Sequence, residues 1–174
     1  MTSDQATAIL NGIGLPSLQA EHPVTKRVIA AIPADKVDYR PDEIVKSAID
    51  LAWHIVTVEI RFLDAVCAGA FDLTPVPRPE SVCTADDVNR WYEQRFVETF
   101  DKLKQTPADQ LTKRIDFRGL LQLPAVAYVQ LGLSHTIHHR GQLSMYLRPM
   151  GAKVPAIYGE SYDVRIVREA AGSS

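Results

Sequence analysis

Apolar residues recur along this chain at spacings of three and four, the period of a helix that buries one face. Four segments carry this pattern, and none shows the sustained alternation of apolar and polar residues that is typical of a half-buried strand. We therefore expect helices over about 15–32, from Pro41 to near Gly69, from Thr84 to just before Thr106, and from about Leu123 to Leu147. Four such apolar stripes predict an all-α fold, and a four-helix bundle is the compact way to bury them together.

Residues with preferences for helix ends support these limits. Pro41 is followed by two acids, which suits the first turn of a helix whose apolar stripe starts at Ile44. Thr84 has Asp87 three positions later, a capping pair that opens the third helix. Pro23 must kink or restart the first helix, because proline removes a backbone hydrogen-bond donor.

The connections between the helices determine the expected topology. Residues 71–82 contain three prolines and predict an extended link that spans the bundle, so that the second and third helices run parallel. Residues 108–119 have no sustained period and predict a loop with some extended backbone. The resulting helix order is up-down-down-up, and we expect a single domain over 1–174 because no repeat or linker divides the sequence.

Composition and charge exclude several classes of protein. Nineteen Lys and Arg against twenty-one Asp and Glu give a net charge of -2, which offers no basic excess for a nucleic acid. The sequence has no run of about 18 apolar residues for a membrane span and no cationic start of an export signal. Two isolated cysteines, Cys67 and Cys83, suit a reducing compartment. We expect a cytoplasmic, unexported protein.

Three histidines carry the candidate chemistry. His135 and His139 stand four positions apart in the fourth helix, on a stripe that we expect to face inward with Gln142 and Tyr146. Unpartnered imidazoles are costly in a buried stripe, and a divalent metal ion would remove that cost. His54, beside the apolar stripe of the second helix, is the natural third ligand. Three imidazoles would leave a coordination position for water or substrate, as in catalytic zinc sites.

Other readings of these residues stay open. A helix with His-x-x-x-His can be an ordinary solvated face, and His138 is turned off the line of the pair. His22, next to a proline, is a weaker ligand candidate and suits packing better. Gly132 and Gly141 each cost the fourth helix about 1 kcal/mol relative to alanine, so we expect a close approach of another helix there.

The sequence also resembles a known family, the DinB-like (DNA-damage-inducible) proteins. The resemblance rests on the following segments of the chain: Leu51-Ala52-Trp53-His54, His135, His139-Arg140-Gly141-Gln142, Tyr146-Leu147-Arg148, Gly151, Val154-Pro155 and Tyr158-Gly159. It implies a four-helix bundle of up-down-down-up order with His54, His135 and His139 as the metal triad. It also implies a homodimer, which is common in the family.

Family members include bacillithiol and mycothiol transferases, so the resemblance implies an enzyme that activates a small thiol on its metal for transfer to an electrophile. Zinc or nickel is the expected ion. Arg140 or Arg148 would pair with a carboxylate of the thiol, and Gln142 and Tyr146 would line the open side of the metal, although surface or packing roles stay open for each. The small-molecule substrate and the metal are not readable from residue types.

Two alternatives lead to other functions. A metal-dependent hydrolase would use the same vacancy for a water molecule, with Asp50 as a general base one turn before His54. A non-enzymatic, stress-related metal-binding protein would close the coordination sphere with a fourth protein ligand, for which Asp50 or Glu59 is placed.

Overall fold

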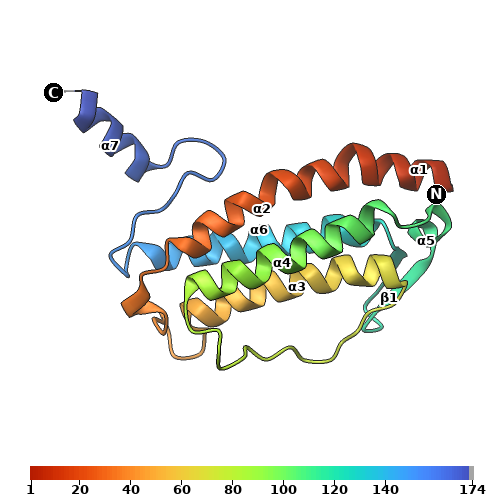
Figure 1. Ribbon diagram of the computed structural model, residues 1–174, viewed down its shortest axis with the longest axis horizontal. Coiled ribbons are helices and arrows are strands. Elements are labelled where there is room, and N and C mark those ends of the chain that lie inside the picture. The colour runs from red at the N-terminus through yellow and green to blue at the C-terminus, as the bar shows by residue number, and fades with distance from the viewer. Residues whose placement is uncertain (173–174) are drawn as a thin grey trace.

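A computed structural model describes residues 1–172 of the chain and shows a bundle of long helices (Figure 1). The elements in chain order are α1 (Ser3–Ile9), a π-helical turn (Leu10–Gly14), α2 (Leu15–Ala30), a 3-10 turn (Ala34–Lys36), α3 (Ala48–Ala68), α4 (Ala85–Lys104), α5 (Ala108–Thr112), β1 (Arg114–Phe117), β2 (Leu121–Pro124), α6 (Ala127–Leu147) and α7 (Tyr162–Gly172). The expected all-α fold is confirmed, with one small hairpin added.

The four long helices run in the expected up-down-down-up order. In Figure 1, α2 runs from right to left, α3 and α4 both run from left to right, and α6 returns from right to left. The segment between α3 and α4 is extended, as its prolines predict, and crosses the bundle along the lower edge of the same view. This long crossover is what allows α3 and α4 to be parallel.

The first helix is longer than the sequence pattern indicates. It begins at Ser3, where Thr2 and Gln5 form a capping box, and continues through a π-helical turn into α2. Pro23 lies inside α2, so of the two expected outcomes, a kink or a restart, the restart was wrong. Leu18 and Val28, on either side of the proline, are buried in the core, and this packing offsets the cost of the missing hydrogen bond.

The second long helix begins later than Pro41 suggests. Ser47 is the cap of α3, and its hydroxyl oxygen accepts a hydrogen bond from the backbone N–H of Asp50. Ile44 therefore lies outside the helix and is 93% exposed, so its assignment to the apolar stripe was wrong. The expected end is confirmed, because Gly69 adopts a left-handed conformation (φ 77°) that closes α3.

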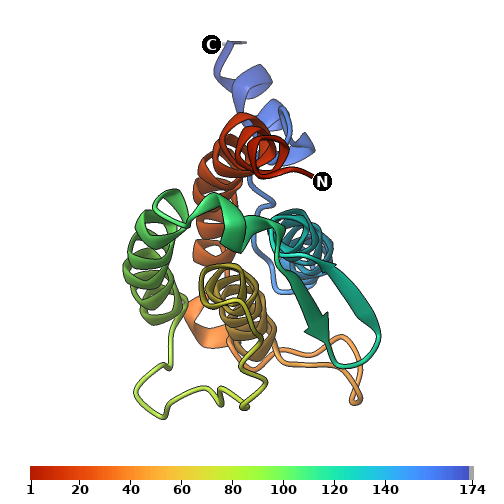
Figure 2. The ribbon, with the colours of Figure 1, turned by 90° about the vertical axis from the view of Figure 1, so that its right-hand side faces the viewer.

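The segment after α4 holds more structure than the expected loop. Residues 108–112 form α5, and β1 pairs antiparallel with β2 with Ile115 opposite Leu123. Both strands meet a buried tyrosine, because the Tyr128 hydroxyl contacts the carbonyl oxygens of Ile115 and Leu121. The fourth long helix consequently starts at Ala127 and not at about Leu123. The hairpin covers one end of α3 and α6 (Figure 2).

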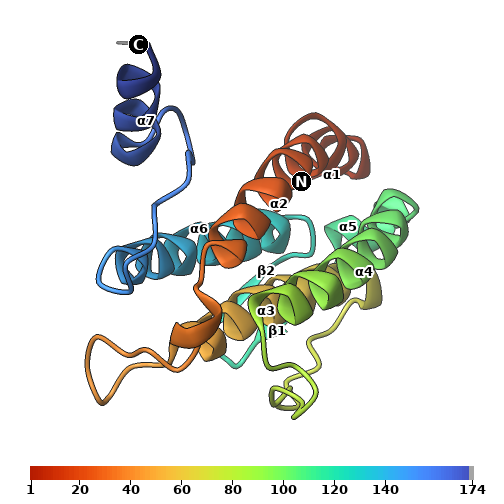
Figure 3. The ribbon, with the colours of Figure 1, turned by 60° about the vertical axis from the view of Figure 1, so that its left-hand side comes forward.

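The last described helix, α7, stands away from the bundle. Figures 1 and 3 both show it beyond the end of α6, joined by an irregular segment, while the other long helices pack together. Its tether includes a contact of the Asp163 carboxylate with Arg148 at 3.1 Å. No helix among residues 1–172 is long and apolar enough to cross a membrane.

Candidate metal centre

The candidate metal centre depends on an unusually close approach of α3 and α6. A β-carbon added at Gly132 of α6 would lie 2.7 Å from Cβ of Phe62 on α3, which is closer than two non-bonded carbon atoms approach in proteins. Only glycine fits there, as expected for a residue that costs the helix stability. The same expectation was wrong for Gly141, which has open space around it. Gly132 is one turn before His135, so this contact brings the histidines of the two helices together.

His54, His135 and His139 form a cluster that could hold a metal ion. Each side chain offers one ring nitrogen, and these three nitrogens lie within 4.8 Å of one another. The ring centroids are 5.0 Å apart for His54 and His135, 4.7 Å for His54 and His139, and 4.3 Å for His135 and His139. All three side chains are half-buried. The sequence therefore predicted three residues from two helices that the fold does bring together.

Two members of the cluster, His54 and His135, are held in the neutral form that a metal requires. Burial, reinforced by repulsion from the neighbouring His139, lowers the pKa of His54 and of His135 to about 4 each. The buried Nδ1 of His135 has no hydrogen-bond partner among the described residues. Neutral imidazoles with an unsatisfied buried nitrogen fit a divalent cation, which would supply the missing partner.

Gln142 has a different place from the one expected. Its Oε1 lies 2.6 Å from Nδ1 of His139, one turn earlier on α6. This contact fixes the ring orientation and assigns the proton to Nδ1, which leaves Nε2 free to bind a cation. Gln142 thus orients a ligand-type residue. A hydrogen-bonding side chain three positions after a candidate ligand is the signal in the sequence for this role.

The other two histidines lie outside the cluster. His138 is exposed, as its position off the line of the pair predicts, although its ring is 4.9 Å from that of His139. His22 is buried in the core, where its ring stacks on Phe96 at 3.8 Å and its Nε2 meets Glu93 at 3.0 Å. The packing role expected for His22 is therefore what the structure shows.

The histidine pair borders the inward face of α6 and does not continue it, contrary to the expectation. The buried residues that follow His135 on this helix are Thr136, Arg140, Leu143 and Leu147. Each is one position after a residue of the expected stripe, which turns the buried face by about 100°. The histidines consequently reach both the core and the outside, which a substrate-accessible site requires.

Arg140 is held inside the bundle, away from the open side of the cluster. Its guanidinium donates to Glu21 at 2.6 Å, to Thr25 at 3.2 Å and to the Tyr158 hydroxyl at 2.6 Å. The side chain is 1% exposed, so the structure does not bring it to a carboxylate of a ligand. Arg148 is also engaged elsewhere, with Asp163. Arg140 therefore does not make the expected contact with a ligand carboxylate. It also does not form an ordinary surface ion pair, because its partners enclose it inside the bundle.

Tyr146 lies two turns beyond His139. It is half-buried beside Tyr39, with ring centroids 6.1 Å apart, and donates to the carbonyl oxygen of Lys46 at 3.5 Å. This places it against the turn before α3. A contact of Tyr146 with a ligand at the metal remains a prediction.

The two carboxylates considered as extra ligands are both occupied. Asp50 meets Arg78 at 2.9 Å and Arg40 at 3.8 Å, and the Ser47 hydroxyl donates to it at 2.6 Å. Glu59 is 1% exposed and accepts a hydrogen bond from the Tyr92 hydroxyl at 2.5 Å. Neither belongs to the cluster among the described residues. Neither carboxylate is therefore placed as a fourth ligand, and the hydrolase remains a prediction.

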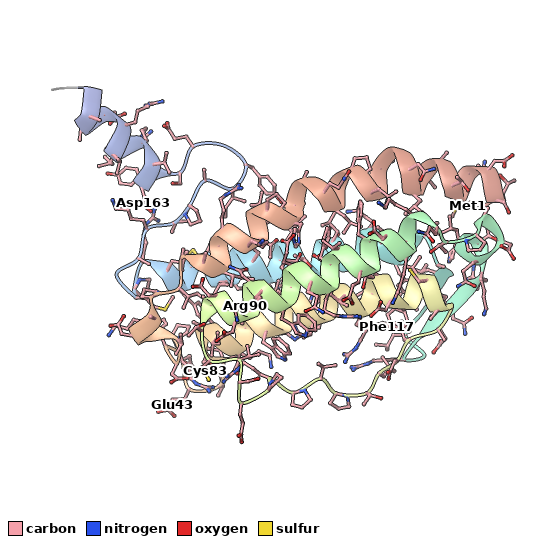
Figure 4. All side chains as sticks on the ribbon, in the orientation of Figure 1. Met1, Glu43, Cys83, Arg90, Phe117 and Asp163 are labelled. Atoms are coloured by element: carbon pink, nitrogen blue, oxygen red, sulfur yellow. The ribbon has the colours of Figure 1, made fainter. Side chains whose placement is uncertain are left out.

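A large cleft lies beside the cluster. Its volume is about 1110 Å³, and both His54 and His135 line it, together with apolar residues such as Trp53 and Phe62. It extends from the turn that contains Ile44 to the hairpin residue Phe117. Figure 4 labels Glu43 and Phe117 near these two ends, at the lower left and right of the bundle. A small molecule therefore has access to the open side of the histidines.

These features define a four-helix bundle that carries an open three-histidine cluster between its α3 and α6 helices. The model of the DinB family matches residues 13–166, so the chain belongs to the DinB family.

Similar proteins agree with this assignment. The chain is 30% identical to the uncharacterized protein YjoA of Bacillus subtilis over 130 residues, which cover 74% of this chain and 82% of YjoA. It is 31% identical to the uncharacterized protein YrdA of the same organism over 116 residues, covering 63% of this chain and 64% of YrdA.

Two crystal structures have the same fold. The DinB-like protein YjoA of Bacillus subtilis superposes with a TM-score of 0.69 at 26% identity, over 85% of this chain and 99% of that one. A DinB-like protein of Bacillus cereus superposes with a TM-score of 0.68 at 23% identity, over 83% and 95% of the respective chains. The second similarity concerns the fold alone.

Proposed function

We propose that this chain is a metal-dependent enzyme that binds a small thiol at an ion held by His54, His135 and His139 and transfers the sulfur to an electrophile. The observation that carries the proposal is the open cluster of three imidazoles, of which those of His54 and His135 line a large cleft. A divalent ion bound there lowers the pKa of a coordinated thiol, so that it is a thiolate at neutral pH.

The residues of the chain supply position and access. The thiol proton leaves to water, a carbon–sulfur bond forms, and the bond from that carbon to its leaving group breaks with the electron pair on the departing atom. Gln142 orients His139, and the cleft holds the electrophile beside the sulfur. The reaction requires no protein nucleophile, which suits a cleft whose lining contains no cysteine.

The ion that we propose is zinc or nickel. Three imidazoles accommodate both, and by affinity order alone nickel displaces zinc from such a site. Elemental analysis of protein purified without a nickel column measures which ion is retained. One equivalent of zinc or nickel supports the assignment, whereas protein that retains neither and binds neither on titration contradicts it.

Activity is tested with metal-loaded protein, a panel of small thiols, and two electrophiles, a chlorodinitrobenzene and an aryl epoxide. We expect thioether formation that depends on the metal, is abolished in His139→Ala, and is retained in Lys104→Gln, which removes a cation of α4 that is paired with Asp101 outside the cleft. No acceleration for any thiol with either electrophile contradicts the proposed reaction. Ester and amide substrates in the same assay test the hydrolase.

We also propose that two copies of the chain associate through α7. This helix exposes a broad apolar face, with Tyr162 at 59%, Val164 at 42% and Val167 at 51% exposure. The described part of α7 stands away from the bundle, so this face does not cover its own core. Sedimentation is expected to show a dimer, and Val164→Asp with Val167→Asp a monomer. A monomeric parent protein contradicts this assembly.

A further inference from the structure

The walls of the cleft are strongly cationic although the chain as a whole has a net charge of -2. Among residues 1–172, Asp50 is the only carboxylate that lines it. Five cationic side chains line it, namely Arg40, Lys46, Arg61, Arg78 and Arg118. A concave surface lined by one sign of charge concentrates ligands of the opposite sign.

Asp50 does not neutralise this excess. It is paired with Arg78 at 2.9 Å and lies 3.8 Å from Arg40, so its single charge is shared between these two cations. Within the described residues, Lys46, Arg61 and Arg118 form no ion pair with a carboxylate. Three cations in the same cleft therefore remain available to a ligand.

Arg61 is positioned by the chain to face the cleft. Its Nη2 donates to the carbonyl oxygen of Thr74 at 2.6 Å, in the extended segment that crosses below the bundle. Arg61 follows His54 by seven residues, two turns along the same face of α3, which corresponds to about 10 Å along the helix axis. Thr57 and Val58, between these turns, also line the cleft. The histidine cluster and the guanidinium thus belong to one continuous wall.

Most of the remaining lining is apolar or aromatic. Trp53 and Phe62 come from α3, Phe117 from the hairpin, and Leu73 and Val76 from the crossing segment. A ligand that matches this cleft has an apolar body and carries its negative charge about 10 Å from the atom that meets the histidines.

We infer that the cleft selects an anionic substrate, an organic carboxylate, sulfonate or phosphate with an apolar body, and that Arg61 and Arg118, at the hairpin end of the cleft, are the residues that recognise its charge. This inference rests on the proposed function because it names the substrate class of the same site. Guanidinium and ammonium groups bind such anions by charge-assisted hydrogen bonds, which a neutral analogue cannot form.

A matched pair of fluorescent probes tests the inference without thiol and without catalysis. Anilinonaphthalene sulfonate and phenylnaphthylamine share one ring system and differ by the sulfonate group. Quenching of tryptophan emission reports binding in the cleft, because Trp53 lines it and Trp91, the only other tryptophan, lies 4.7 Å away. We expect the sulfonate to bind the full chain about tenfold more tightly than the neutral amine, with and without metal.

The variants assign the preference to residues. Arg61→Gln and Arg118→Gln are each expected to weaken sulfonate binding about three- to tenfold and to leave amine binding unchanged. Lys104→Gln, which removes a cation paired with Asp101 on α4, is the matched control and is expected to change neither. Equal affinity for the two probes, or equal weakening of both probes by Arg61→Gln, overturns the inference.

The two proposals fail separately. Thiols that do not bind the metal-loaded protein contradict the transferase, while the probe pair still measures the anion preference of the cleft. Conversely, a metal-dependent transferase that does not distinguish 8-mercaptooctanoate from 8-mercaptooctanol, together with equal probe affinities, retains the proposed reaction and removes the anionic substrate.

Discussion

Two polar regions of this protein start from adjacent residues of α6, His139 and Arg140, and have opposite properties. Arg140 points into the bundle, where Glu21, Thr25 and Tyr158 together satisfy its guanidinium. His139 points to the border of the cleft, in a cluster where the buried Nδ1 of His135 has no partner among the described residues. A polar group that the protein satisfies completely stabilises the fold, whereas one left incomplete is available to a ligand.

Glu59 extends the satisfied region. Burial raises the pKa of its carboxyl group, which the Tyr92 hydrogen bond and the charge of Arg140 oppose. Tyr92 is itself fully buried and lies beside His22, whose ring centroid is 4.4 Å away. Glu59 and Tyr92 therefore satisfy one another, whereas the buried Nδ1 of His22 has no hydrogen-bond partner among the described residues.

The largest expected effect is the loss of metal from the open cluster. His139→Ala removes one of three candidate ligands and is expected to weaken zinc binding about a thousandfold, roughly 4 kcal/mol. Competition with a chromogenic chelator measures this, and circular dichroism is expected to show unchanged helix content. His138→Ala is the control and should bind zinc as the parent does. Loss of helix content in His139→Ala would mean that the cluster supports the fold.

In the satisfied region around Arg140, we expect a substitution to lower stability without a loss of metal. Arg140→Met leaves the Glu21 carboxylate without its cation at a side-chain exposure of 15%, and we expect about 3 kcal/mol less stability. Urea unfolding measures the loss, and zinc stoichiometry of the folded fraction should remain one. A variant with parental stability would show that the Glu21–Arg140 pair contributes little.

Gln142 tests whether the hydrogen bond to His139 supports the cluster. Gln142→Ala is expected to weaken zinc binding about 10–100-fold, the usual cost of removing a group that orients a metal ligand. Since Gln142 is exposed, the metal-free protein should keep its stability. Gln142→Glu preserves the acceptor and is expected to restore binding. Equal affinity of all three proteins would contradict the orienting role.

The two glycines of α6 form a matched pair. Gly132→Ala places a methyl group 2.7 Å from Phe62 and is expected to destabilise the fold by about 1–3 kcal/mol and to weaken metal binding by moving α6 from α3. Gly141→Ala meets no atom within 4 Å and should stabilise the helix by up to about 1 kcal/mol. Thermal unfolding of both variants measures the difference in their stability. Equal stability of the two variants would show that α3 and α6 do not approach closely at Gly132.

A pH dependence of the metal-free chain is expected as well. The pKa of His54 and of His135 is lowered to about 4, against about 6.5 in an unfolded chain, so the unfolded state binds more protons between these values. The free energy of unfolding should therefore be constant above about pH 6.5 and fall towards pH 4. His54→Gln with His135→Gln should flatten the curve, and His138→Gln should not. A slope unchanged by the double variant would contradict these shifts.

The sequence by itself determined the helices, their order and the three histidines. Helical periodicity located the apolar faces, prolines marked the long crossover, and the spacing of His135 and His139 placed two imidazoles on adjacent turns. These properties are local or follow from connection length, so they can be read without coordinates. Even so, the start of α3 was misplaced, because Pro41 and its two acids imitate a first turn while Ser47 provides the actual cap.

Only the tertiary structure decided how the polar residues are used. Arg140 and Gln142 differ little in sequence context, but one is enclosed by α2 and the segment after α6, and the other orients His139. Likewise, Arg61 and Arg118 come together at one cleft from a helix and a hairpin distant in sequence. Such partners depend on a rotation of about 100° between neighbouring residues of a helix and on the packing of separate elements, and the pattern of a single segment contains neither.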